Sequence, residues 1–149
     1  EKKFNFELFK NLCNQLESVT IINFFDEKSL LKLFDGYNFP YLADFTLMSF
    51  SSKRLNKEFM NGFSTLTQLN ITECAIEVIE YDSFSNMQQL TSLNLSKNRI
   101  GLIEKNTFSN LNNLKTLDLS DNKLTKFDPN FIGIGNSVEV KIENNIFNS

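Results

Sequence analysis

The sequence contains no histidine and no tryptophan, and its 149 residues include only two cysteines and two prolines. Without histidine, neither a Ser-His-Asp triad nor a Cys-His pair can be assembled, and no imidazole is available as a metal ligand. Two cysteines are too few for a thiolate zinc site and can form at most one disulfide. We therefore expect no catalytic residues, no metal site and no cofactor.

Long apolar runs and a dominant charge are also missing. No stretch approaches the 18 consecutive apolar residues of a membrane-spanning helix, so no span is predicted within this chain. The 15 basic and 18 acidic side chains give a net charge of −3, which argues against the concentrated basic face of a nucleic-acid-binding protein. The first residues show no basic segment followed by an apolar one, so we interpret the chain as a mature or excised segment.

What the sequence does contain, including 16 phenylalanines, is periodic. Residues 66–89, 90–113 and 114–136 begin 24 residues apart and share the pattern L-x-x-L-x-L-x-x-N/C-x-L/I, followed by a phenylalanine. Weaker versions of the pattern cover 16–41 and 42–65, and the pattern restarts at 137–149 as a terminal half-repeat or cap. With 1–15 as an N-terminal capping segment, we predict a single domain over 1–149 with about six strand-bearing units.

The repeated pattern predicts a stack of coils. Alternate residues of a strand point to opposite faces, so Leu93 and Leu95 are expected to face the interior while Asn94 faces solvent. One unit cannot bury its apolar side alone, whereas a stack buries it continuously. The strands are therefore expected to line up as a parallel sheet.

Polar residues at the turn after each strand have a predicted structural role. Asn98 and Asn122 can satisfy backbone groups that the turn would leave unpaired inside the stack. Cys74 occupies the same position one unit earlier, and it is separated from Cys13 by more than two units, so we expect no disulfide between them. Phenylalanines that recur about once per unit are predicted to form a buried spine: Phe84, Phe108 and Phe131.

This pattern and its period resemble the typical 24-residue leucine-rich repeat of extracellular animal proteins, such as Toll-type receptor ectodomains and secreted immune leucine-rich-repeat proteins. The resemblance implies an α/β repeat solenoid: a horseshoe arc with a parallel β-sheet on the concave face and short irregular or 3-10 segments on the convex face. It also implies an extracellular setting, either secreted or as a cell-surface ectodomain. The closing residues 145–149 are similar to the Asn-Pro-Phe-x-Cys start of a stapled cap, with Ile for Pro and Ser for Cys.

The concave face is where solenoids usually bind their partners. Its predicted outward side chains are mixed in charge, and two of them are apolar, although scattered apolar residues are ordinary on a protein surface. The candidate partner-binding residues are Ile22, Asp44, Thr46, Met48, Gln68, Thr72, Glu73, Lys97, Asp118 and Asp121. A catalytic role for the pair Asp118 and Asp121 is disfavoured, because nothing in the sequence predicts a cleft around them.

Two segments match the acceptor motif for N-linked glycans, Asn70-Ile71-Thr72 and Asn94-Leu95-Ser96. Glycosylation at Asn70 and Asn94 is expected if the chain is secreted. The alternative is structural, because Asn-Leu-Ser also follows from the repeat pattern itself.

The sequence therefore favours a non-enzymatic extracellular recognition module that binds a protein ligand or co-receptor, with the resemblance pointing to innate immunity. Rigid display would let a partner bind without a large ordering cost. An alternative from a different class is a structural or assembly subunit that forms a homodimer through its convex side or its uncapped end. A third is an intracellular scaffold. No nucleic acid and no direct membrane insertion are expected.

Overall fold

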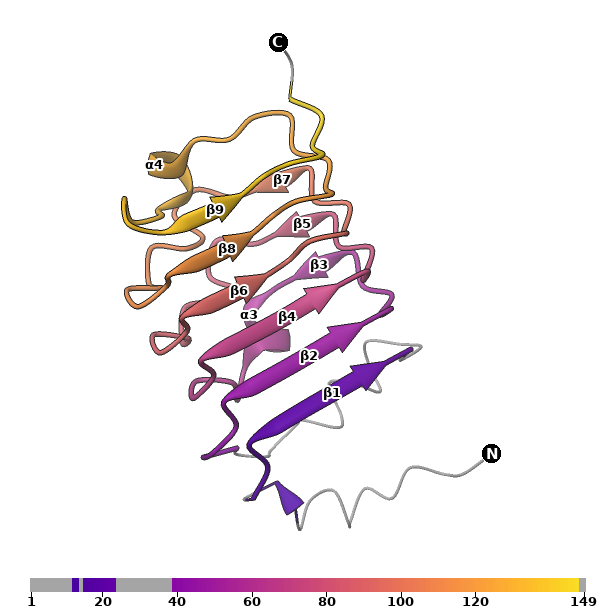
Figure 1. Ribbon diagram of the computed structural model, residues 1–149, viewed down its shortest axis with the longest axis vertical. Helices are drawn as coiled ribbons and strands as arrows, with labels where there is room; N and C mark the ends of the chain where they lie inside the picture. The colour runs from indigo at the N-terminus through magenta and orange to yellow at the C-terminus, as the bar shows by residue number, and fades with distance from the viewer. Residues whose placement is uncertain (1–11, 14, 24–38, 148–149) are drawn as a thin grey trace.

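The protein is a stack of parallel coils, shown in Figure 1 as a computed structural model. The structure describes residues 12–13, 15–23 and 39–147. Most of the predicted capping segment 1–15 and much of the unit 16–41 lie outside the described residues. No helix in the described part of the chain is long and apolar enough to cross a membrane.

One strand from each coil enters a six-stranded parallel sheet with the order β1-β2-β4-β6-β8-β9. Neighbouring strands pair in register one repeat apart, so that Leu69 pairs with Leu93 and Leu93 with Leu117. This sheet is the concave side of the predicted arc, and the α/β solenoid fold is confirmed. The strands are β1 (Ser18–Ile22), β2 (Asp44–Met48), β4 (Gln68–Thr72), β6 (Ser92–Asn94), β8 (Thr116–Asp118) and β9 (Glu139–Lys141).

The core follows from the alternation of side chains along these strands. Leu93 and Leu117 are each 1% exposed, and Leu95 is completely buried. Burying each such side chain contributes roughly 1.5–3 kcal/mol. Because the same positions are apolar in successive coils, their side chains form one continuous interior rather than separate clusters.

The convex side contains a second, smaller parallel sheet that the sequence did not predict. Its three strands are β3 (Arg54–Leu55), β5 (Val78–Ile79) and β7 (Leu102–Ile103), each only two residues long. Two one-turn helices, α3 (Lys57–Met60) and α4 (Pro129–Ile132), lie on the same return path. Figure 1 shows the three short strands and α3 behind the larger sheet, with α4 at the edge beside β9.

The predicted phenylalanine spine is only partly correct. The rings of Phe84 and Phe108 stack with centroids 5.6 Å apart, and both residues are buried. Phe131 is instead 42% exposed, and its neighbour Ile132 is 4% exposed and takes the interior position. The prediction for Phe131 was wrong because Ile132, not Phe131, lies 24 residues after Phe108. The unit 114–136 is one residue shorter than the two before it. Because Ile132 keeps the spacing of 24 from Phe108, the shortening lies after Ile132, where Gly133 turns the chain with a φ of 78°.

The predicted asparagine contacts are confirmed by a hydrogen-bonded ladder. Asn98 Oδ1 accepts from the backbone N–H groups of Cys74 and Ile76 at 3.0 and 3.2 Å. Asn98 Nδ2 donates to the carbonyl oxygens of Ile71, Leu95 and Ser96. Asn122 and Asn145 repeat this arrangement one and two coils later.

Cys74 begins this ladder with a thiol in place of an amide. Its Sγ lies within hydrogen-bonding distance of the carbonyl oxygens of Thr72 at 3.0 Å and Leu47 at 3.4 Å, which share its single S–H proton. Burial raises the pKa of this thiol to about 11. Burial also raises the pKa of Cys13, and no disulfide joins the two cysteines.

Candidate functional site

The outward side of the six-stranded sheet, hereafter the sheet face, carries the predicted binding residues in straight rows. The parallel register is the cause, because it places residues one repeat apart next to each other. One row contains Asp44 and Gln68, a second contains Thr46, Asn70, Asn94 and Asp118, and a third contains Ile22, Met48 and Thr72. The fold thus brings together predicted residues that are far apart in the sequence.

The remaining predicted residues form a fourth row just beyond the strand ends. Glu73, Lys97 and Asp121 all have positive φ, between 54° and 58°. This left-handed conformation turns the chain sharply out of the strand and is uncommon for residues other than glycine. Lys97 Nζ lies 3.5 Å from Glu73 Oε1, so these two candidate residues form an exposed ion pair.

Three residues of this fourth row are absent from the predicted set, and one of them, Asn23 with a φ of 57°, directly follows β1. Asn144 has a φ of 56° and donates from Nδ2 to Asp121 Oδ1 at 2.9 Å. Ser49 has a φ of 54° and extends the row in the other direction. The signal for both was available, because Ser49 lies 24 residues before Glu73 and Asn144 lies in the shortened last repeat.

Side chains within the rows are held by hydrogen bonds. Asn70 Nδ2 donates to Thr46 Oγ1 at 3.2 Å, which joins two adjacent strands on the sheet face. Thr116 Oγ1 donates to Ser92 Oγ at 3.0 Å in the same way. These cross-strand contacts limit the rotamers available to the side chains, so the surface is ordered before any partner binds.

The polar groups at the ends of the strands are also occupied. Asn94 Oδ1 accepts from Ser96 N at 3.0 Å. Asp118 Oδ1 accepts from Ser120 N at 2.9 Å and from Ser120 Oγ at 2.6 Å. Such local contacts close the turn after the strand. They give Asp118 a structural role.

The two predicted glycan acceptors differ in how their sequons are placed. Asn70 and Asn94 are both half-buried on central strands of the sheet face. Thr72 of the first sequon is also half-buried, whereas Ser96 of the second is only 8% exposed. A glycan on either asparagine would cover the rows of candidate residues around it.

The sheet face is apolar at one corner and charged at the opposite end. Ile22 is 57% exposed, and Met48 lies beside it in register and is half-buried. Carboxylates outnumber lysines over the whole face, and they concentrate toward β8 and β9. The charged residues are Glu17, Asp44, Glu73, Lys97, Lys115, Asp118, Asp121, Glu139, Lys141 and Glu143. Within the described ranges, no three acidic or cysteine side chains converge in a way that could hold a metal ion.

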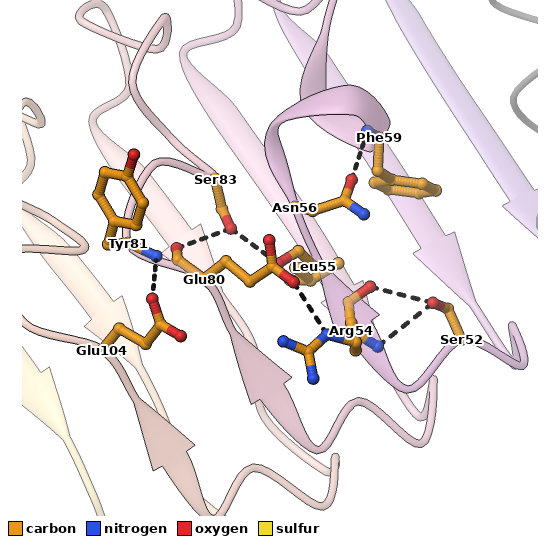
Figure 2. Close-up of polar contacts among 9 residues, drawn as sticks. All are labelled: Ser52, Arg54, Leu55, Asn56, Phe59, Glu80, Tyr81, Ser83 and Glu104. Carbon is orange, nitrogen blue, oxygen red and sulfur yellow. Dashed lines mark hydrogen bonds and ion pairs between the residues drawn. The ribbon is translucent and has the colours of Figure 1, made fainter.

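The convex side contains polar contacts between neighbouring coils, which Figure 2 shows. Arg54 Nε lies 2.8 Å from Glu80 Oε1, and Glu104 Oε2 accepts from Tyr81 N at 3.0 Å. Ser83 Oγ lies 2.8 Å from two backbone carbonyl oxygens that share its single O–H proton, one on its own coil and one on the previous coil. Each of these contacts joins one coil to its neighbour. We therefore assign them to the scaffold rather than to a binding site.

A parallel sheet with an asparagine ladder and a 24-residue period defines a leucine-rich-repeat solenoid. The family model described as "Leucine rich repeat" matches residues 40–100, 64–124 and 88–145 in three overlapping alignments. The chain therefore belongs to the leucine-rich repeat family. A comparison with curated proteins finds no match.

Two solved structures share the fold at low sequence identity. An internalin from Listeria monocytogenes, InlF, is 21% identical with a TM-score of 0.58, over 86% of this chain and 34% of the internalin. A structure of the TLR13–ssRNA13 complex is 20% identical with a TM-score of 0.60, over 93% of this chain and 23% of TLR13. This chain thus spans about a quarter to a third of the length of these proteins.

Proposed function

We propose that this chain is a non-enzymatic recognition module that binds a protein ligand or co-receptor through the sheet face. The observation that carries the proposal is the set of side-chain rows, held in register and tied by hydrogen bonds such as Asn70 to Thr46. A surface ordered in this way loses little conformational entropy when a partner binds. Proteins of the leucine-rich repeat family are typically interaction modules without catalytic activity, which supports the same conclusion.

The charges of the sheet face favour a protein partner over RNA. The TLR13 structure contains a single-stranded RNA, so RNA is a reasonable alternative to consider. Carboxylates outnumber lysines on this sheet face, whereas binding to a phosphate backbone depends on clustered lysine and arginine. The exposed apolar corner at Ile22 and Met48 instead suits an apolar contact with a protein, surrounded by polar groups.

The extracellular setting and the innate-immune role belong to the proposal as well. The resemblance to Toll-type and secreted immune repeats supports them, as do the two sequons at Asn70 and Asn94. Expression in a eukaryotic secretory host, followed by glycosidase digestion, tests this part. A mobility shift that disappears in Asn70→Gln and Asn94→Gln variants would support it. Secretion without any shift would remove the support for a glycan at these two residues.

The binding experiment uses the chain as bait in the extracellular fluid of its source. We expect Met48→Glu and Glu73→Lys to weaken capture of the partner while the melting temperature is unchanged. Two convex-side variants serve as matched controls, Leu102→Glu for the apolar change and Glu58→Lys for the charge reversal. Unchanged capture by both sheet-face variants would refute binding at the sheet face.

A further inference from the structure

The pairing of coils on the convex side is interrupted after β7. Strands β3, β5 and β7 join three successive coils there by parallel pairing. In the next coil, residues 124–130 form no backbone hydrogen bond with residues 101–105, although both segments lie within the described part of the chain. The contact between these two coils resumes where Asn106 N donates to Phe131 O at 2.9 Å.

The local sequence at Asp128 and Pro129 explains the interruption. The Asp128 carboxylate accepts from the backbone N–H groups of Asn130 and Phe131 and so caps α4. Pro129 begins this helix, because its fixed φ suits the first helical position and it has no N–H to donate to a strand. The chain therefore enters a one-turn helix at the point where a fourth short strand would pair with β7.

The interruption leaves an apolar groove of about 180 Å³ between the two coils, hereafter the convex groove. Leu102 and Phe131 line it and remain 50% and 42% exposed. Small-molecule sites usually measure about 300–1,000 Å³, so this groove suits an apolar side chain of a protein segment rather than a metabolite. The other apolar residues that line it are buried or half-buried: Ile103, Leu124, Phe127 and Ile132.

The convex groove lies inside the stack, between two neighbouring coils. The structure describes both coils, 90–113 and 114–136, in full. Ile146 N donates to Leu124 O at 3.0 Å, so a further coil already packs on the second of them. The opening is therefore a separation between adjacent coils, and it does not depend on how the stack continues.

Basic side chains without ion-pair partners surround the convex groove. Lys126 lines the groove, and Arg99 and Lys123 line an adjoining hollow that shares Gly101 and Leu102 with it. All three cations are exposed, and none forms an ion pair with a carboxylate of the described residues. Their charges are thus available to a ligand.

The carboxylates that line the hollow and the groove already have partners. Glu77 Oε1 lies 3.6 Å from Lys53 Nζ. Asp128 accepts from two N–H groups at the start of α4. The free charge around the convex groove is therefore positive, whereas carboxylates predominate on the sheet face.

We propose that the convex groove binds an acidic segment of another protein that inserts an apolar side chain. The inserted side chain packs between Leu102 and Phe131, and the carboxylates beside it pair with Arg99, Lys123 and Lys126. The apolar contact supplies most of the affinity, and the exposed ion pairs orient the segment and select its charge. This ligand is separate from the sheet-face partner, because the convex groove lies on the opposite side of the stack.

Fluorescence anisotropy with short labelled peptides tests the proposal on the full chain. The probe is the peptide Asp-Glu-Phe-Leu-Asp-Glu, and two matched peptides replace either its apolar pair by alanine or its acidic residues by lysine. We expect the probe to bind about tenfold or more tightly than either matched peptide, because each of them lacks one of the two kinds of contact. Added salt should weaken binding of the probe, since its ion pairs are exposed.

Variants of the chain locate the site. Leu102→Glu should weaken binding of the probe about tenfold or more, and Lys126→Glu should weaken it by a smaller factor, because an exposed ion pair contributes little. Both residues are exposed, so the melting temperature should be unchanged. Tyr41→Glu and Lys57→Glu make matching changes at exposed positions outside the groove and should have no effect. Leu102→Glu should also leave sheet-face capture intact, which separates the two sites.

Three results would overturn the proposal. Equal binding of the alanine peptide would exclude an apolar anchor, and equal or tighter binding of the lysine peptide would exclude selection by charge. Probe binding that neither Leu102→Glu nor Lys126→Glu weakens would place the site elsewhere. A chain that binds vesicles containing phosphatidylserine but not the probe would likewise contradict a protein segment as the occupant.

Discussion

Replacing Asn98 by alanine should destabilise the fold more than any other single asparagine change in the ladder. The change removes both side-chain atoms through which Asn98 forms hydrogen bonds with the previous coil, Oδ1 and Nδ2. Oδ1 no longer accepts from the backbone N–H groups of Cys74 and Ile76, and Nδ2 no longer donates to three carbonyl oxygens. Asn98 is 8% exposed, so water cannot readily replace the lost partners.

The magnitude follows from the two N–H groups that lose their acceptor. A buried donor left without a partner costs about 1–3 kcal/mol, so two such donors predict a loss of about 2–6 kcal/mol in the free energy of unfolding. Asn145 provides the matched control. It makes the same kind of contacts but is only half-buried, with Oδ1 accepting from Leu124 N. Because water can reach this site, Asn145→Ala should cost less than about 1 kcal/mol.

Urea unfolding followed by circular dichroism measures both variants against the parent chain. We expect similar dependence on urea concentration and a midpoint that falls strongly for Asn98→Ala but only slightly for Asn145→Ala. Asn122→Ala should lie between them, because Asn122 Oδ1 accepts from one N–H group, that of Ile100. Equal losses for Asn98→Ala and Asn145→Ala would refute the argument that buried donors control the stability of the ladder.

Three further predictions follow from the structure. Leu95→Asp places an unpaired charge in a fully buried position, so no cooperative unfolding transition should remain, whereas a wild-type-like melt would contradict the interior position of Leu95. Lys97 has a φ of 55°, which asparagine adopts more readily than lysine and valine adopts less readily. In urea titrations, Lys97→Asn should therefore stabilise the chain by about 0.5–1 kcal/mol and Lys97→Val should destabilise it by about 1 kcal/mol. The reverse order of the two variants would contradict this prediction. The pKa of Cys74 is raised to about 11 from 9.0, so the unfolded thiol ionises first and stability should fall between about pH 9 and 11. The difference from Cys74→Ala measured across that range isolates this effect, and a flat difference would exclude it.

The interior of the stack could be predicted from the sequence because it repeats. Leu93, Leu95 and Asn98 recur at fixed offsets, so three adjacent units were enough to assign the sheet, its direction and the ladder. The error at Phe131 has a simple cause. The residue type indicates Phe131, whereas the spacing of 24 from Phe108 indicates Ile132, which the structure buries.

Other features leave little trace in the sequence. Strands β3, β5 and β7 are two residues long, too short for an alternating pattern to be recognised. The left-handed conformation at Glu73 and Lys97 was also invisible, because neither residue favours positive φ by itself. Tertiary context imposes it, since the chain must leave the strand sharply at the same point in every coil.

The same alternation that predicts the core explains why the ligand could not be predicted. Inward residues such as Leu93 are constrained by neighbours in the coils before and after them, so their identity is tied to the fold. Outward residues such as Gln68 and Met48 contact mainly solvent and the adjacent row, so the fold tolerates many side chains there. The repeat pattern therefore determines where a partner can bind but not which one.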